Sequence, residues 1–72
     1  MRQMRGVVLR CYPNVFGADV TDPNGRTSRV VLAYAEVSED QREFVRVGAR
    51  FIWLAHERQG ALHTVGLQFD KS

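Results

Sequence analysis

Residues 47–55 constrain the fold more than any other stretch of the chain. They contain the only tryptophan and the densest run of apolar side chains. In an extended strand, Phe51 and Trp53 point to one face, and Ile52 and Leu54 point to the other. A strand that is apolar on both faces lies either in the middle of a closed barrel or partly against a binding partner.

Length and composition indicate a single small domain, residues 1–72. A domain of this size buries only about 60% of its unfolded surface, which limits its stability. Cys11 is the only cysteine, so no internal disulfide can form, and one cysteine with two histidines is no zinc-finger ligand set. We therefore expect no metal and no cofactor, and a fold that depends on its core or on a partner.

No apolar run has the length of a signal-peptide core or of a membrane span. We therefore expect a cytoplasmic protein without membrane contact. The net charge of +2 is too small to identify a partner. Nine of the ten basic residues are arginines, which suit phosphate, carboxylate and planar rings, although a GC-rich genome produces the same bias.

Turn-forming residues recur at short intervals with strand-like runs between them, which is typical of an all-β chain. We predict strands at residues 6–12, 15–21, about 27–37, 50 to 57 or 58, and 62–70. The strongest turn signal lies between the second and third strands, where proline presets φ and an Asn-Gly pair tolerates positive φ. It consists of Asp22, Pro23, Asn24 and Gly25.

A short helix is predicted at about residues 39–45, between the third and fourth strands. Ser38 is a candidate N-cap, and Gln41 follows three residues later, as in a capping box. Phe44 and Val45 are its apolar residues, and we expect them to close one end of a barrel.

Alternation assigns the faces of the first strand. Arg10 shares a face with Val8 and Tyr12, so this set is predicted to point outward. The residues predicted to face the core are Val7, Leu9 and Cys11.

The remaining strands follow the same rule with one ambiguity. Inward sets are predicted for the second strand (Phe16, Ala18, Val20) and the fifth (Val65, Leu67, Phe69). The third strand has two candidate inward sets, a bulky one (Val30, Leu32 and Tyr34) and a small one (Val31, Ala33, Ala35 and Val37). Either set is inward over the whole strand, or a bulge switches the parity and buries parts of both.

The predicted order of elements is three strands, a short helix and two further strands. This order resembles the OB-fold, whose helix falls between strands three and four. The resemblance is one of topology and covers nearly the whole chain. It implies a small five-stranded barrel that removes its sheet edges. An SH3-like barrel is the competing architecture, because bent five-stranded meanders give a similar pattern.

Catalysis has little support in the sequence, and we expect a protein that is not an enzyme. Most acidic residues lie beside turns or on the predicted helix. Cys11 with His56 or His63 as base is the nucleophile–base combination considered, and a cysteine on the core face acts as a small hydrophobe. His56 and His63 flank the last hairpin and are predicted to be exposed.

Single-stranded nucleic-acid binding is one hypothesis, because small barrels combine arginine-lined grooves with aromatic stacking platforms. An OB-like barrel implies a binding face across strands two and three, but the second strand offers no outward aromatic residue. The candidate contact residues are Arg10, Tyr12, Arg26, Arg29, Arg50 and Arg58.

Protein association is the hypothesis that we place first, because the apolar excess is better evidenced than a basic groove. Tyrosine and tryptophan are typical anchors of protein interfaces, and exposed apolar clusters mark them. The expected role is an accessory or adaptor subunit, an antitoxin-like inhibitor, or a homo-oligomer. The candidate interface residues are Val8, Tyr12, Ile52, Trp53 and Leu54.

Overall fold

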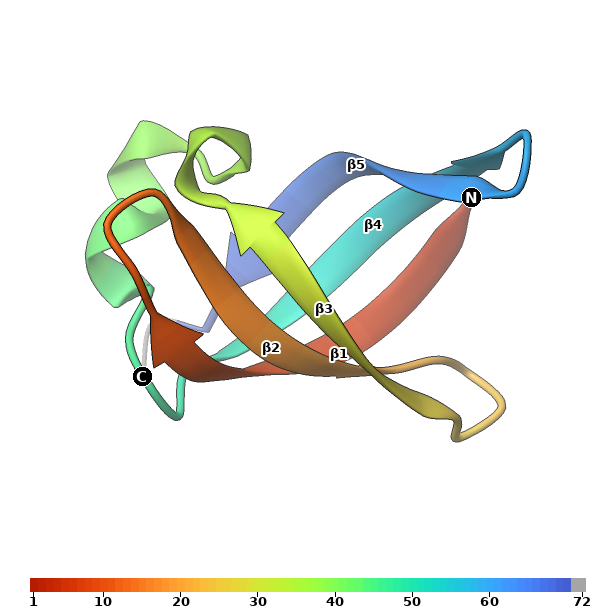
Figure 1. Ribbon diagram of the computed structural model, residues 1–72, viewed down its shortest axis with the longest axis horizontal. Coiled ribbons are helices and arrows are strands. Elements are labelled where there is room, and N and C mark those ends of the chain that lie inside the picture. Colours follow the sequence, from red (N-terminus) through yellow and green to blue (C-terminus); the bar gives the residue numbers. More distant parts are fainter. Residues whose placement is uncertain (71–72) are drawn as a thin grey trace.

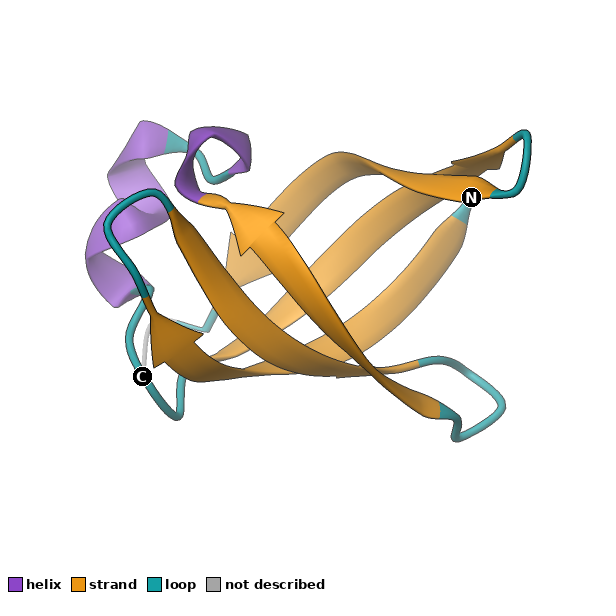
Figure 2. Cartoon of the chain, viewed as in Figure 1, coloured by secondary structure: helices purple, strands orange, loops and turns teal. Residues whose placement is uncertain are grey.

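The computed structural model describes residues 1–70, which form five antiparallel strands and two short 3-10 helices. The strands are β1 (Arg2–Cys11), β2 (Val15–Thr21), β3 (Thr27–Ala33), β4 (Arg50–Arg58) and β5 (Ala61–Phe69). The helices η1 (Tyr34–Glu36) and η2 (Glu39–Phe44) lie between β3 and β4. Figure 1 shows one strongly curled sheet, a half-barrel, with both helices at one end. The predicted all-β class and the order of elements are confirmed (Figure 2).

The sheet has the order β3-β2-β1-β4-β5, so β1 lies at its centre. Residues 2–7 of β1 pair with β4, and residues 5–11 pair with β2. The strand is longer than predicted because it begins at Arg2 rather than at Gly6. One long strand therefore joins the two halves of the curl.

The faces of β1 differ from the prediction because of a bulge at Leu9. Val8 pairs with the inward Ala18, whereas Arg10 pairs with the outward Gly17, so the register shifts between them. Val8 is consequently in the core and only 1% exposed. The prediction of an inward Val7 and Leu9 was wrong: Val7 is exposed, and Leu9 is the half-buried residue of the bulge. Cys11 lies opposite the inward Phe16, so it is on the predicted face, but it is exposed rather than buried.

A second irregularity changes one residue of β5. Leu54 pairs with Gly66 and Ala55 pairs with Thr64, which leaves Val65 as an extra residue outside the alternation. Val65 is therefore exposed, contrary to prediction, while the inward positions of Leu67 and Phe69 are confirmed. A bulge adds one residue without a cross-strand partner, which periodicity alone does not reveal.

Aromatic rings fill the centre of the core. Phe51 and Phe69 stack with centroids 5.0 Å apart, and the Phe16 ring lies 6.0 Å from Phe51 in an edge-on arrangement. The inward set predicted for β2 is confirmed, since Phe16, Ala18 and Val20 are all buried.

The segment after β3 leaves the sheet earlier than predicted. The strand ends at Ala33, four residues before its predicted end at about Val37, and η1 follows. Leu32 faces the core and Val31 faces solvent, while Val37 returns to the core beyond the helix. Each of the two inward sets considered for the third strand thus contributes one buried residue. The change of face is caused by the helical turn η1 rather than by a bulge.

The predicted short helix is present as η2, but its capping box does not form. The Ser38 side chain makes no cap hydrogen bond. Gln41 Oε1 instead accepts a hydrogen bond from the backbone N–H of Phe69, at 2.7 Å. Phe44 and Val45 pack partly buried against the core, as predicted.

Two turns have the backbone geometry that their turn-forming residues favour. The Asp22 carboxylate accepts hydrogen bonds from the backbone N–H groups of Asn24 and Arg26, both at 2.9 Å, and Gly25 has φ +86°. The β4–β5 turn has positive φ at Gln59 (52°) and Gly60 (80°), the combination of a type I′ hairpin.

Candidate binding surface

The sheet face opposite the phenylalanine core is hollowed over β2, β1, β4 and β5. This outer hollow has a volume of about 670 Å³. Its outward side chains on the three central strands are Arg5, Val7, Asp19, Thr21, Arg50 and Ile52, and Gln68 and Asp70 line it on the β5 side. Gly6, Phe51 and Phe69, which lie between these residues in the strands, complete the lining. The alternation that sends Phe51 and Trp53 into the core sends Ile52 to this surface.

Cross-strand register arranges the outer hollow in two rows. One row contains, in order across the sheet, Thr21, Arg5, Ile52 and Gln68. The other contains Asp19, Val7 and Arg50. Each row therefore sets an arginine directly opposite an aliphatic side chain, Arg5 beside Ile52 and Arg50 beside Val7.

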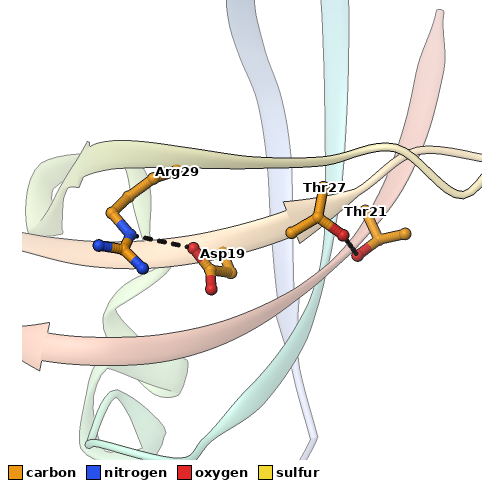
Figure 3. Close-up of polar contacts among 4 residues, drawn as sticks. All are labelled: Asp19, Thr21, Thr27 and Arg29. Carbon is orange, nitrogen blue, oxygen red and sulfur yellow. Dashed lines mark hydrogen bonds and ion pairs between the residues drawn. The ribbon is translucent and has the colours of Figure 1, made fainter.

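The β2–β3 side of the outer hollow is fixed by two polar contacts, which Figure 3 shows. Arg29 Nε donates to Asp19 Oδ1 at 3.2 Å, and the hydroxyl oxygens of Thr21 and Thr27 lie 3.0 Å apart. The arginine side chain is 76% exposed, so this ion pair contributes only about 0–1 kcal/mol. Its main effect is to orient the Asp19 carboxylate.

Unlike Arg29, the two arginines of the outer hollow, Arg5 and Arg50, have no ion-pair partner among residues 1–70. Among residues 1–70, the ion pairs are Arg2 with Glu57 and Arg29 with Asp19, and neither includes Arg5 or Arg50. Both guanidinium groups are therefore available to an external carboxylate or phosphate, next to the apolar surface of Val7 and Ile52.

The predicted interface residues do not form one cluster. Val8 and Trp53 are core residues, 1% and 4% exposed, so the outward orientation predicted for Val8 was wrong. Ile52 lines the outer hollow, and Leu54 is the next outward residue of β4 and is half-buried. Tyr12 is 48% exposed beside the β1–β2 turn, outside the lining of the hollow.

The predicted nucleic-acid contacts are also spread over the molecule. Arg50 lines the outer hollow, and Arg29 is its neighbour through Asp19. Arg10 lies opposite Gly17 on the same sheet face. Arg26 belongs to the β2–β3 turn and Arg58 ends β4, so both are at hairpin ends rather than in the hollow.

Sequence reasoning missed Arg5 and Val7 as surface residues of the hollow. The strand prediction began at Gly6, which excluded Arg5. Val7 had been assigned to the core because Arg10 fixed the parity, and the bulge at Leu9 breaks that parity. The signal that would have found both is the alternation of Met4, Gly6 and Val8 as a second inward set.

The groups considered for catalysis are separated. His56 and His63 are cross-strand partners in the last hairpin and both are exposed, as predicted. Cys11 is exposed beside Tyr34 rather than in the core. The hydrogen bond with the Cys11 side chain, then burial and the charge of Cys11, raise the pKa of Tyr34 above its ordinary 10.0. Within residues 1–70 no three potential metal ligands of the His, Cys, Asp and Glu types come together.

Comparison with protein-family models, with curated proteins and with solved structures finds no match to this chain. None of the helices formed by residues 1–70 is long and apolar enough to cross a membrane.

Proposed function

We propose that the protein is a cytoplasmic protein-binding module, an accessory, adaptor or inhibitor subunit rather than an enzyme, and that its outer hollow takes a segment of a partner. The observation that carries the proposal is the hollow itself, about 670 Å³ in volume, with aliphatic side chains between two arginines. Binding sites are concave and combine apolar surface with a few placed polar groups.

The chemistry of the hollow favours a partner segment that carries an apolar side chain next to a carboxylate. Ile52 and Val7 offer the apolar contact, and Arg5 and Arg50 lie directly opposite them in the sheet. A guanidinium group binds a carboxylate with two parallel hydrogen bonds, which sets the orientation as well as the charge.

A peptide selection tests this proposal. The purified chain is used to select binders from a displayed library of random linear peptides, and their affinities are measured by fluorescence anisotropy. We expect enrichment of peptides with Leu, Ile or Phe beside Asp or Glu, and weaker binding at higher salt. Ile52→Asp places a carboxylate among the apolar contacts, and Arg50→Glu reverses a charge, so each should reduce affinity at least tenfold.

The matched control is Val65→Asp, an exposed valine that lies outside the outer hollow. It introduces the same charge into the same sheet and should leave peptide affinity unchanged. Circular dichroism confirms that each variant is folded. Selected peptides without acidic residues, or peptides that bind Ile52→Asp as tightly as the wild type, would contradict the proposal.

Single-stranded nucleic acid is the second candidate, because Arg5, Arg10 and Arg50 share the outer face. It has weaker support, since Tyr12 is the one exposed ring among the seven aromatic residues, all of which are described. Stacking on rings contributes about 1–3 kcal/mol per base in such sites. Retardation of a single-stranded oligonucleotide that falls log-linearly with salt and is lost in Arg10→Glu would favour it over peptide binding.

We infer further that the half-barrel is an OB-like barrel that is open between β3 and β5. The inference is supported by the central β1, which pairs with both β2 and β4, and by the helices between β3 and β4. In an OB-fold the ligand face includes strands two and three. That face adjoins the outer hollow through Asp19 and Thr21, so both candidate ligands would use neighbouring surfaces.

A further inference from the structure

The two edges of the half-barrel differ in how they are protected. At the β5 edge, Gln41 Oε1 accepts the hydrogen bond of the Phe69 N–H at 2.7 Å. Glu36 Oε2 accepts a hydrogen bond from the Thr64 hydroxyl at 2.8 Å, and Val65 forms a bulge. These are the features by which proteins prevent a sheet edge from pairing with another chain.

The β3 edge has none of these features. All seven residues of β3 keep a regular register with β2, from Thr27 opposite Thr21 to Ala33 opposite Val15. The strand contains no proline, lysine or bulge, and its one charged residue, Arg29, is paired with Asp19. Within residues 1–70, β2 is the only strand that pairs with it. Val31, 69% exposed, lies near its middle.

Hydrogen bonds at both ends of the β2–β3 ladder show which backbone groups face this edge. Asp22 N–H donates to the Arg26 carbonyl at 2.9 Å, and Tyr34 N–H donates to the Asn14 carbonyl at 3.1 Å. Bonded and non-bonded pairs alternate in an antiparallel ladder. The N–H and C=O groups that point away from β2 therefore belong to Thr27, Arg29, Val31 and Ala33.

We propose that β3 pairs antiparallel with β3 of a second copy of this chain, about a two-fold axis at Val30. This register overlaps all seven residues and forms roughly eight backbone hydrogen bonds, two for each bonded pair. Arg29 lies opposite the partner's Val31, and Val30 lies opposite its own equivalent. The two half-barrels then form one continuous sheet.

Charge and strand length select the register, and the absence of a charge conflict favours a second copy as the occupant. An axis at Arg29 sets two guanidinium groups directly opposite each other, which is unfavourable. An axis at Val31 leaves Thr27 without a strand partner. With the axis at Val30, each arginine keeps its own Asp19, at 3.2 Å, and meets an apolar side chain of the other copy. The strand thus matches its own reversed sequence without a charge conflict.

The dimer is expected to be weak. A strand-to-strand contact of seven residues is smaller than the roughly 1,200–2,000 Å² of a standard stable interface, so we expect dimerisation only at high protein concentration. Sedimentation equilibrium up to about 1 mM protein detects a dimer whose dissociation constant is micromolar to millimolar.

Substitutions of Val31 test the register. Val31→Lys places an ammonium group opposite the partner's Arg29 twice in each dimer and should weaken dimerisation more than about tenfold. Val31→Glu places a carboxylate at the same point and should maintain or tighten the dimer. Val65→Lys is the matched control, an exposed valine of the other edge strand, and should behave as the wild type.

Amide exchange supplies a readout that does not depend on any variant. Exchange of the Arg29 and Val31 N–H groups should slow as protein concentration rises, while that of exposed turn amides stays constant. The proposal is overturned if the wild type is monomeric at about 1 mM, as it would be if the edge takes only a foreign strand. It is also overturned if Val65→Lys or Ile52→Asp abolishes the dimer while Val31→Lys does not, because the interface then lies elsewhere.

Discussion

Gly6 occupies a position where the fold has no room for a side chain. A Cβ atom there would lie 2.2 Å from Cζ of Phe51 and 2.6 Å from both Cε atoms. Ordinary contacts begin at 3.4 Å, so the ring would have to retreat by about 1.2 Å (3.4 − 2.2). Phe51 is 3% exposed and stacks on Phe69, so the ring has no free space to enter. Gly6→Ala should therefore destabilise the protein strongly.

The expected cost is about 3 kcal/mol, at the upper end of the range for adding a methyl group to a packed core. A domain of 72 residues has a free energy of unfolding of about 4–11 kcal/mol, so the variant still folds with reduced stability. The melting temperature should fall by roughly 12–24 °C. Urea unfolding followed by Trp53 fluorescence measures the change, at a fixed low protein concentration so that association does not contribute.

Two variants make the test specific to this contact. Gly17→Ala is the matched control, because nothing lies within 4 Å of its added Cβ, and it should be neutral or slightly stabilising. Phe51→Leu shortens the side chain that Gly6→Ala would strike, so the double variant should lose less than the sum of the single losses by about 1 kcal/mol or more. If Gly6→Ala and Gly17→Ala are equally stable, the packing of Phe51 against Gly6 is refuted.

Three further predictions concern single contacts. Thr64→Val leaves the buried Trp53 Nε1–H without its acceptor at 2.9 Å and should cost about 1–3 kcal/mol in urea unfolding, whereas Thr64→Ser should cost less. Gln59→Asn should stabilise the β4–β5 hairpin by up to about 1 kcal/mol, because Asn tolerates the positive φ of 52° better, and an unchanged urea midpoint would contradict this. The pKa of Tyr34 is raised, so its stabilising contribution is complete below pH 10.0 and is lost as pH rises through the folded pKa. In an ultraviolet titration, Cys11→Ala should move one phenolate transition to lower pH, and identical titration curves would exclude the hydrogen bond between the two side chains.

Much of the fold could be predicted because local chemistry and tertiary structure agree over most of the chain. The Asp22 turn, the β2 strand and the inward Phe16, Ala18 and Val20 all follow from turn residues and strict alternation. The limits of β4 were also predicted, because Gly48, with φ +89°, precedes a dense apolar run.

The errors in face assignment have one physical cause. A bulge changes parity within a strand, and the bulges at Leu9 and Val65 depend on which partner strand lies opposite, not on the local sequence. Arg10 was read correctly as outward, but extending its parity to Val7 and Val8 was wrong. The missing capping box has a similar origin, since Gln41 bonds a distant strand instead of its own helix.

The candidate surface was predictable only in part, because it depends on parity in three strands at once. Ile52 was identified from its own strand, but Arg5 and Val7 become its neighbours only through the β1–β4 register. The hollow is a property of sheet curvature, which no single strand encodes.

The size of the core explains why this protein exposes so much apolar surface. Hydrophobic residues make up 44% of the chain, yet the buried core contains only twelve residues. A half-barrel of this length has too little interior for the other hydrophobic residues. Four valines are therefore exposed, namely Val7, Val31, Val47 and Val65. Two of these four have a structural setting that favours a partner: Val7 lies in the outer hollow and Val31 on the open edge of β3. Because the two settings are on different parts of the sheet, Val31→Lys and Ile52→Asp should impair different associations, and a variant that impairs both would show that they are one interface.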